Sequence, residues 1–149
     1  MRPFLLCGLL LLTLPATAEQ WRVVGDEQFA PYSFVAADDD TPRGLDVELV
    51  AAVLDEAGIS YRLRLYPWQR VKRMLGRGEA EMAFQFAGTP ERHAEYRLVG
   101  PIRTGSTVFI TSTRTAIKEW QEFEDLSPYV IGQVRGYAYE DAFDHADLA

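Results

Sequence analysis

The spacing of apolar residues changes along the chain between a helical and a strand-like pattern. The stretch 45–58 predicts a helix, because its apolar positions share one face: Val47, Val50, Val53, Leu54 and Ala57. Asp46 can cap this helix at its start, and Gly58 can close it. The next stretch, 60–66, alternates outward polar with inward apolar side chains, which predicts a strand.

The same reasoning assigns the rest of the chain. It predicts further helices over 67–78 and 116–127, and helix starts at Thr89 and after Gly136. Further strands are predicted over 21–24, 80–86, 106–113 and 129–134, with an aromatic loop or irregular edge strand over 29–36. Strands that alternate with helices indicate an α/β fold with a mainly parallel sheet.

The N-terminus reads as a signal peptide over residues 1–18. Arg2 supplies the positive region, residues 4–14 are an apolar run, and residues 16–18 are small, as before a cleavage site. An uncleaved N-terminal anchor is the alternative. The only cysteine, Cys7, lies inside this signal, so the mature chain has no disulfide. Export without disulfides suits a bacterial periplasmic protein.

Charge and motifs exclude several function classes. Without the signal, the chain has 14 basic and 22 acidic residues, a formal net charge of −8, and no basic stripe for nucleic acid. The run "DDD" at 38–40 lacks the spacing of a calcium loop, and the two histidines do not have metal-ligand spacing. No G-x-S-x-G, P-loop or G-x-G-x-x-G motif is present. We therefore expect no metal, no cofactor and no catalysis.

Candidate binding residues follow the predicted strands. In open α/β sheets, ligands bind beyond the carboxyl ends of the strands. The segments 25–32, 67–68 and 85–92 occupy that place, and their notable side chains are Asp26, Phe29, Tyr32, Trp68, Gln85, Thr89 and Arg92. Aromatic, polar and cationic groups together predict a pocket for a small molecule with an apolar body and an anionic group. The alternative for Phe29 and Trp68 is a place in the core, where aromatic residues near strand ends are more often found.

Arg92 stands out within "GTPERHAEY", residues 88–96. Thr89 suits the N-cap and Pro90 the first helical position, but a cation in the first turn is repelled by the helix dipole. A bound carboxylate would remove that repulsion, since the guanidinium can hold it bidentately beside free backbone N–H groups. The alternative is that Arg92 pairs with Glu95 or packs on Tyr96.

Five segments in order resemble one protein family, the bacterial extracellular solute-binding proteins of family 3. They read "RVVGDEQFAPYSF", "RGLDVELVAAVLDEAG", "YPWQRVKRMLGRGEAEMAF", "GTPERHAEYRLVGPI" and "FEDLSPYVIGQVRGYAYE". The resemblance implies two α/β lobes that close on a ligand like a clamshell. It further implies that Arg92, in the T-x-x-R segment with Thr89, holds a carboxylate.

The resemblance also implies roles for the other candidates. Phe29 would stack on the ligand, Trp68 would line the pocket, and Asp26 is the acid near the end of the first strand. Gln85 and Ala87 would line the site where small hydroxyl residues are common in the family. A Gly-Thr pair often touches the ligand from the second lobe, and here the pair is Gly136-Tyr137.

The resemblance finally implies a domain division and a function. Residues 19–110 would form lobe one, 111–115 a hinge, and 116–149 an incomplete second lobe, giving a truncated clamshell. The expected function is capture of a carboxylate-bearing ligand, a polar amino acid, for uptake through an inner-membrane ABC permease by a monomeric periplasmic protein. The alternatives are a sensory input module of a membrane signalling protein and an enzyme on the same fold.

Overall fold

The computed structural model describes residues 19–36, 39–115, 117 and 119–148. The predicted signal peptide and its Cys7 lie outside these residues, as does part of the 38–40 aspartate run. Within the described residues, no helix is long and apolar enough to cross a membrane.

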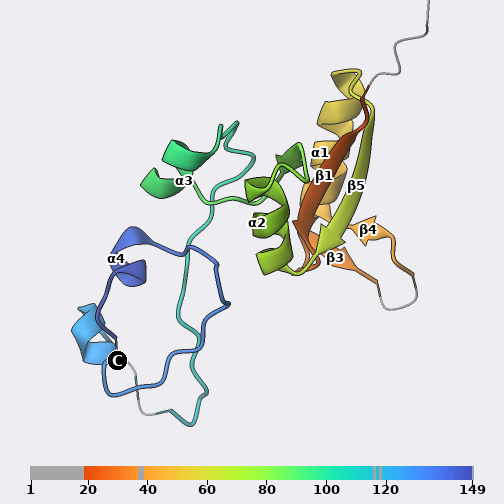
Figure 1. Cartoon of the computed structure of the whole chain (residues 1–149). Helices are drawn as coiled ribbons and strands as arrows, with labels where there is room; N and C mark the ends of the chain where they lie inside the picture. The colour runs from red at the N-terminus through yellow and green to blue at the C-terminus, as the bar shows by residue number, and fades with distance from the viewer. Residues whose placement is uncertain (1–18, 37–38, 116, 118, 149) are drawn as a thin grey trace, which may run out of the picture.

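A three-stranded parallel sheet forms the centre of the fold. Its strands are β1 (Trp21–Asp26), β5 (Tyr61–Tyr66) and β6 (Met82–Ala83), in the order β5-β1-β6 (Figure 1). Strand β1 pairs along its whole length with β5 and over residues 23–24 with β6. The predicted parallel α/β arrangement is therefore confirmed. Strand β1 runs through Gly25, where the sequence predicted its end, and β6 is much shorter than the predicted 80–86.

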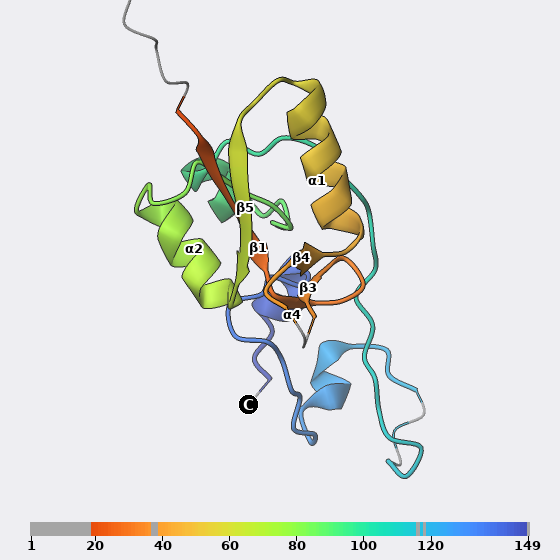
Figure 2. The same ribbon diagram turned by 90° about the vertical axis from the view of Figure 1, so that its right-hand side faces the viewer.

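Two helices cover opposite faces of this sheet. They are α1 (Leu45–Glu56) and α2 (Trp68–Gly76), and Figure 2 shows them on either side of β1 and β5. Side chains alternate between the faces of a strand. Val23 accordingly packs into the cluster beneath α1, and Val24 packs with Trp68 and Val71 of α2. Both helix predictions are confirmed to within two residues at each end.

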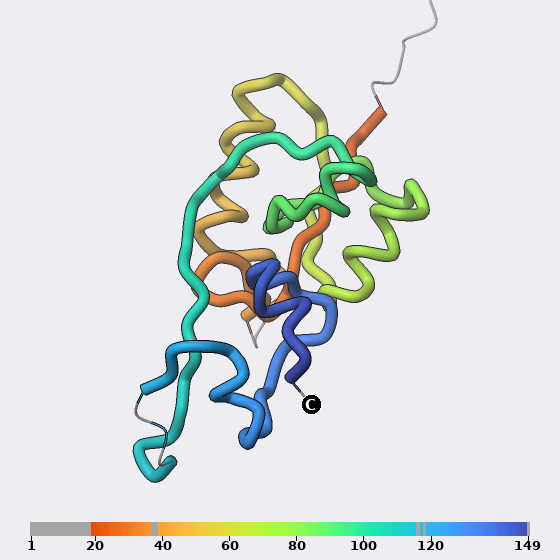
Figure 3. The backbone as a smooth tube through the Cα atoms, turned by 90° about the vertical axis from the view of Figure 1, so that its left-hand side faces the viewer, coloured from red at the N-terminus to blue at the C-terminus, as the bar shows by residue number. Residues whose placement is uncertain are grey.

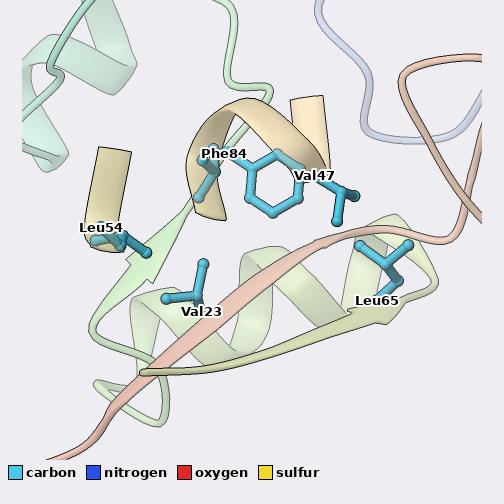
Figure 4. Close-up of a cluster of buried hydrophobic side chains, with 6 residues drawn as sticks. Val23, Val47, Leu54, Leu65 and Phe84 are labelled. Atoms are coloured by element: carbon cyan, nitrogen blue, oxygen red, sulfur yellow. The ribbon is translucent and has the colours of Figure 1, made fainter. Parts of the chain in front are cut away.

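The larger hydrophobic cluster lies between the sheet and α1. Its buried members come from β1, α1, β5 and the end of β6: Val23, Val47, Val50, Leu54, Leu65 and Phe84 (Figure 4). Phe84 is 4% exposed, and its ring lies against Gly25 so closely that a Cβ there would overlap it. Glycine at this position of β1 leaves room for the ring.

A small antiparallel sheet adjoins the carboxyl end of β1. It consists of β2 (Gln28–Phe29), β3 (Ser33–Val35) and β4 (Pro42–Arg43). The predicted irregular edge strand over 29–36 is thus a short hairpin. Its first strand carries Phe29 toward the end of the central sheet.

The start of α1 differs from the prediction. Gly44 is the N-cap residue, with a φ of +125°, and no side chain caps the helix. A Cβ at Gly44 would overlap the backbone of Tyr32. Asp46 instead lies within the first turn, where it is 3% exposed. Its carboxylate is used in a hydrogen-bond network at the candidate site, so the prediction that Asp46 caps α1 is wrong.

The chain beyond residue 96 contains little regular structure. Its described elements are η1 (Phe123–Leu126), a 3-10 helix, and α4 (Asp141–Asp144). The predictions of strands over 106–113 and 129–134 are wrong. In place of the helix predicted over 116–127, the described residues contain only the short η1. Residues 116 and 118 lie outside the described residues. A β-type segment becomes a strand only where a neighbour supplies hydrogen-bond partners, and no described residue pairs with either segment.

Aromatic side chains hold this part of the chain together. Phe109, Trp120, Phe123 and Phe143 have ring centroids 5.3 to 6.4 Å apart. Many other apolar side chains of the region are exposed, among them Ile110 at 90%. The short α4 and η1 are therefore positioned by aromatic packing rather than by a sheet.

Glu81, directly before β6, forms an ion pair with Arg22 of β1 whose effect on stability can be measured. Its carboxylate accepts hydrogen bonds from the Arg22 backbone N–H at 2.6 Å and from Arg22 Nη2 at 2.6 Å. These bonds stabilise the charged form and lower the pKa of Glu81 from 4.5 to about 2.

A lowered carboxyl pKa stabilises the fold above the ordinary pKa, and this stabilisation is lost as the pH falls through the folded-state value. We expect Glu81→Gln to lower the melting temperature at pH 6 to 7. The difference from the wild type should shrink between pH 4.5 and about 2. Thermal melts by circular dichroism across this range measure it, and a difference that grows on acidification would contradict the assignment.

Candidate functional site

The predicted site residues gather at the carboxyl ends of the parallel strands. Asp26 ends β1, Trp68 begins α2 directly after β5, and Gln85 follows β6. Phe29 reaches the same region from the hairpin. Figure 3 shows the blue C-terminal segment passing across this end of the sheet, and Tyr137 of that segment contacts Asp26. Segments from four separate parts of the sequence thus meet where open α/β sheets bind ligands.

Three aromatic rings line one part of this region. The Tyr137 ring meets Phe29 and Trp68 edge to face, with centroids 5.9 Å apart in both pairs. Trp68 is 7% exposed and also packs on Phe86 at 4.8 Å. Trp68 is therefore a core residue whose ring also lines the candidate site beside Tyr137. The two interpretations from the sequence, a core position and a position at the site, do not exclude each other.

Tyr137 and Asp26 form the principal polar contact between these segments. The Tyr137 hydroxyl donates to Asp26 Oδ2. Burial and the neighbouring carboxylate raise the pKa of Tyr137 far above its ordinary value, so the hydroxyl keeps its proton. The other oxygen of Asp26 accepts from the backbone N–H of Gln28 at 3.0 Å. Both carboxylate oxygens of this buried residue consequently have a donor.

Arg92 is a buried cation held by neutral groups. It is 9% exposed, its Nη1 donates to the carbonyl oxygen of Ala87 at 3.1 Å, and its guanidinium carbon lies 5.0 Å from the Phe86 ring centroid and 6.0 Å from that of Trp68. Burial lowers the pKa of Arg92, because the charged form loses hydration. Among the described residues Arg92 makes no ion pair.

The local helix start is as the sequence predicts. Helix α3 (Pro90–Glu95) has Pro90 at its first position and Thr89 as N-cap, whose hydroxyl accepts from the Arg92 N–H at 3.4 Å. Glu95 accepts instead from the Tyr96 hydroxyl at 2.8 Å. The alternative pairing of Arg92 with Glu95 is absent. The Thr89 hydroxyl binds the backbone N–H of Arg92, and the Ala87 carbonyl oxygen binds its guanidinium.

Gln85 is the centre of a hydrogen-bond network behind the aromatic rings. Its Nε2 donates to Ser33 Oγ at 2.8 Å and to Asp46 Oδ2 at 3.1 Å, and its Oε1 accepts from the backbone N–H of Asp26 at 3.4 Å. Gln85 also has a positive φ of 73°. Because both polar atoms already have protein partners, a ligand would have to compete for this side chain.

Arg103 is a site-adjacent residue that the sequence analysis missed. Its guanidinium carbon lies 4.0 Å from the Tyr32 ring centroid and 5.2 Å from that of Phe29, and its Nε donates to Asp46 Oδ2 at 3.2 Å. Such cation–π contacts fix the rings of the hairpin. No periodic pattern surrounds Arg103 in the sequence, so nothing there indicated this role.

The geometry forms two adjoining groups. Asp26, Phe29 and Trp68 surround Tyr137, while the Arg92 guanidinium carbon lies 6.0 Å from the Trp68 ring centroid, with Ala87 and Thr89 beside it. The described residues contain no cluster of three or more side chains that could hold a metal ion. The region contains a buried cation, a carboxylate and aromatic surfaces, which are the groups typical of small-molecule binding sites.

The parallel α/β arrangement is that of part of a periplasmic-binding-protein fold. Residues 21–140 match the family "Bacterial extracellular solute-binding proteins, family 3". The chain is therefore a member of this family, and the resemblance seen in the sequence is confirmed. A comparison with curated protein sequences gives no match.

Several solved structures align with part of this chain, and one of them shows the same fold. An ancestral cationic amino acid solute-binding protein aligns with a TM-score of 0.51 and 24% identity, over 72% of this chain and 47% of its own. A substrate-binding protein of an ABC uptake transporter from Streptococcus pneumoniae, with bound histidine, gives 0.45 and 23% over 51% of this chain and 31% of its own. A histidine kinase sensor domain gives 0.47 and 25% over 50% and 32%. The chain thus spans 31% to 47% of the length of these structures.

Proposed function

We propose that this protein captures a small carboxylate-bearing molecule, a polar amino acid, for uptake by an ABC transporter. The observation that carries the proposal is the buried guanidinium of Arg92, which makes no ion pair among the described residues. Its hydrogen-bond partner is a backbone carbonyl, and the carboxylates of Asp144 and Glu91 act on it only at longer range. A buried charge is costly unless it is paired. A ligand carboxylate would pair with it and accept two of its N–H groups.

The other half of the site suits the rest of an amino acid. Asp26 Oδ2 is an acceptor for a donor on the ligand's side chain, and the Phe29 and Trp68 rings offer apolar surface. In this proposal Asp26, Phe29, Trp68 and Arg92 contact the ligand. Thr89 and Ala87 hold Arg92, and Gln85 holds the backbone of Asp26.

The wider role follows family membership and the resemblance described above. In our proposal residues 19–110 form the first lobe, 111–115 the hinge, and 116–149 belong to the second lobe. Hinge motion would close the lobes on the ligand. The partner would be an inner-membrane permease, the location the periplasm, and the protein a monomer. Capture involves no catalytic step.

Thermal stabilisation by ligands tests the capture function. A panel of amino acids should raise the melting temperature of the protein, because a ligand at a hundredfold excess over Kd stabilises the native state by about 2.7 kcal/mol. Each stabilising amino acid should be compared with the amine that lacks its carboxylate, for example arginine with agmatine.

The expected result is stabilisation by the acid and none by the amine. Stabilisation by both equally would contradict a role for the carboxylate. No stabilisation by any compound of the panel, with calorimetric titration in agreement, would contradict the capture of amino acids.

A further inference from the structure

The phenol of Tyr137 fills the space that the proposed function assigns to the ligand. Its ring lies between Phe29 and Trp68, each 5.9 Å away between centroids, and its hydroxyl donates to Asp26. Tyr137 is 111 residues from Asp26 in sequence, so this contact joins two distant parts of the chain. A side chain of the protein itself thus makes the contacts expected of an aromatic, donor-bearing ligand.

The backbone that carries Tyr137 is fixed at the site. Trp68 Nε1 donates to the carbonyl oxygen of Gly136 at 2.8 Å, and Gln69 Nε2 donates to that of Arg135 at 2.7 Å. Gly136 has a φ of +82°, and a Cβ there would overlap the amide of Gln69. Glycine therefore allows the close approach that places the next residue between the rings.

We propose that Tyr137 is an internal occupant of the site and thereby determines its specificity. A ligand binds by displacing the phenol, and ligands that replace its hydrogen bond to Asp26 are preferred. This inference rests on the proposed function. An open surface pocket of about 510 Å³, lined by residues 133–137 and Asp144, adjoins the Tyr137 segment.

The preference follows from the partners of Asp26. Oδ1 is occupied by the Gln28 N–H, and Tyr137 is the donor to Oδ2 among the described residues. Removing the phenol without a replacement leaves a buried carboxylate oxygen unpaired, which is costly. The favoured ligands are amino acids with a planar side chain that ends in a donor, such as tyrosine. Phenylalanine, which lacks the donor, should bind at least about tenfold more weakly.

Two substitutions test the displacement. Tyr137→Phe keeps the ring but loses the hydroxyl, and Tyr137→Ala removes both. Because the internal competitor is weakened, we expect each variant to bind the best amino acid of the panel more tightly, by about tenfold for Tyr137→Phe and by more for Tyr137→Ala. Tyr139→Phe is the matched control, since it removes a hydroxyl two residues away that does not contact Asp26. Its Kd should equal that of the wild type.

Weaker or unchanged binding by both Tyr137 variants would overturn the inference. Weaker binding would indicate that the phenol contacts the bound ligand rather than competing with it. Equal binding of tyrosine and phenylalanine by the wild type would overturn the specificity argument. In each of these cases amino-acid binding itself persists, so the proposed function stands.

A measurement without ligand tests the internal occupancy directly. In a Trp21→Phe, Trp120→Phe background the remaining indole is that of Trp68. Tyr137→Ala should then shift its emission to longer wavelength and increase its quenching by acrylamide, whereas Tyr139→Phe should not. If no amino acid binds any variant, the proposed function fails, while the emission still shows whether Tyr137 covers Trp68. An unchanged emission in Tyr137→Ala would overturn the inference.

Discussion

Arg92→Ala is expected to weaken amino-acid binding by roughly 30-fold or more while leaving the unliganded protein folded. Truncating one partner of a buried, hydrogen-bonded charge pair costs about 2–5 kcal/mol, which corresponds to an increase in Kd of roughly 30- to 5,000-fold. The unliganded protein should still fold, because the guanidinium makes no ion pair among the described residues and its side-chain hydrogen bond there goes to the Ala87 carbonyl. Loss of its contacts with the Phe86 and Trp68 rings should lower the melting temperature modestly. Calorimetric titration measures the binding, and circular dichroism the melting temperature.

Two further variants sharpen this experiment. Arg73→Ala removes the same side chain from an exposed position of α2 and should leave both Kd and melting temperature unchanged. Arg92→Lys keeps the charge but cannot form a bidentate pair, so its Kd should lie between those of wild type and Arg92→Ala. If Arg92→Ala lowers the melting temperature strongly and leaves Kd unchanged, Arg92 is a structural residue and the proposed carboxylate site is wrong.

Phe84→Ala is expected to destabilise the fold more than any other single change considered. Phe84 is 4% exposed and packs in the cluster formed by β1, α1 and β5. Removing a buried phenylalanine side chain typically lowers the free energy of unfolding by about 3–5 kcal/mol, because transfer energy is lost and a cavity remains. This is a large share of the roughly 5–15 kcal/mol that stabilises a domain. Urea denaturation followed by circular dichroism measures the loss.

A control and a double variant make the Phe84 result specific. Val53→Ala on α1, which is 57% exposed, should change the free energy of unfolding by about 0.5 kcal/mol or less. Gly25→Ala should destabilise the wild type, since the new Cβ overlaps the Phe84 ring. In a Phe84→Ala background the same substitution should cost much less. Strict additivity of the two changes would show that the ring does not lie over Gly25.

Local patterns in the sequence were sufficient to predict α1, β5 and the start of α3. The helical spacing of 45–58 and the alternation of 60–66 correspond to α1 and β5, and Thr89 and Pro90 begin α3 as predicted. These features depend on neighbours a few residues away, so a single sequence contains them. The strand predictions after residue 100 were wrong because a strand also depends on a pairing partner, which local pattern does not reveal.

The candidate site was predictable in its parts but not in its connections. Position after a strand indicated Asp26, Trp68 and Gln85. The bonds that join Gln85 to Ser33, Asp46 and the backbone of Asp26 span 39 to 59 residues and follow no local rule. Tyr137 entered the sequence analysis only as a departure from a Gly-Thr pair. Its contact with Asp26 arises from tertiary structure, so only the structure could reveal it.

Trp68 and Phe29 differ in how freely evolution or design could change them. Trp68 belongs to the buried cluster beneath α2, together with Val24, Val71 and Ala80, whereas Phe29 stands on a two-residue strand outside both core clusters. Exchanging the indole to accommodate another ligand would therefore also loosen the scaffold, but exchanging the phenyl ring would not. Ligand selectivity should therefore change more readily through substitutions at Phe29 in the hairpin, while Trp68 at the start of α2 stays the same.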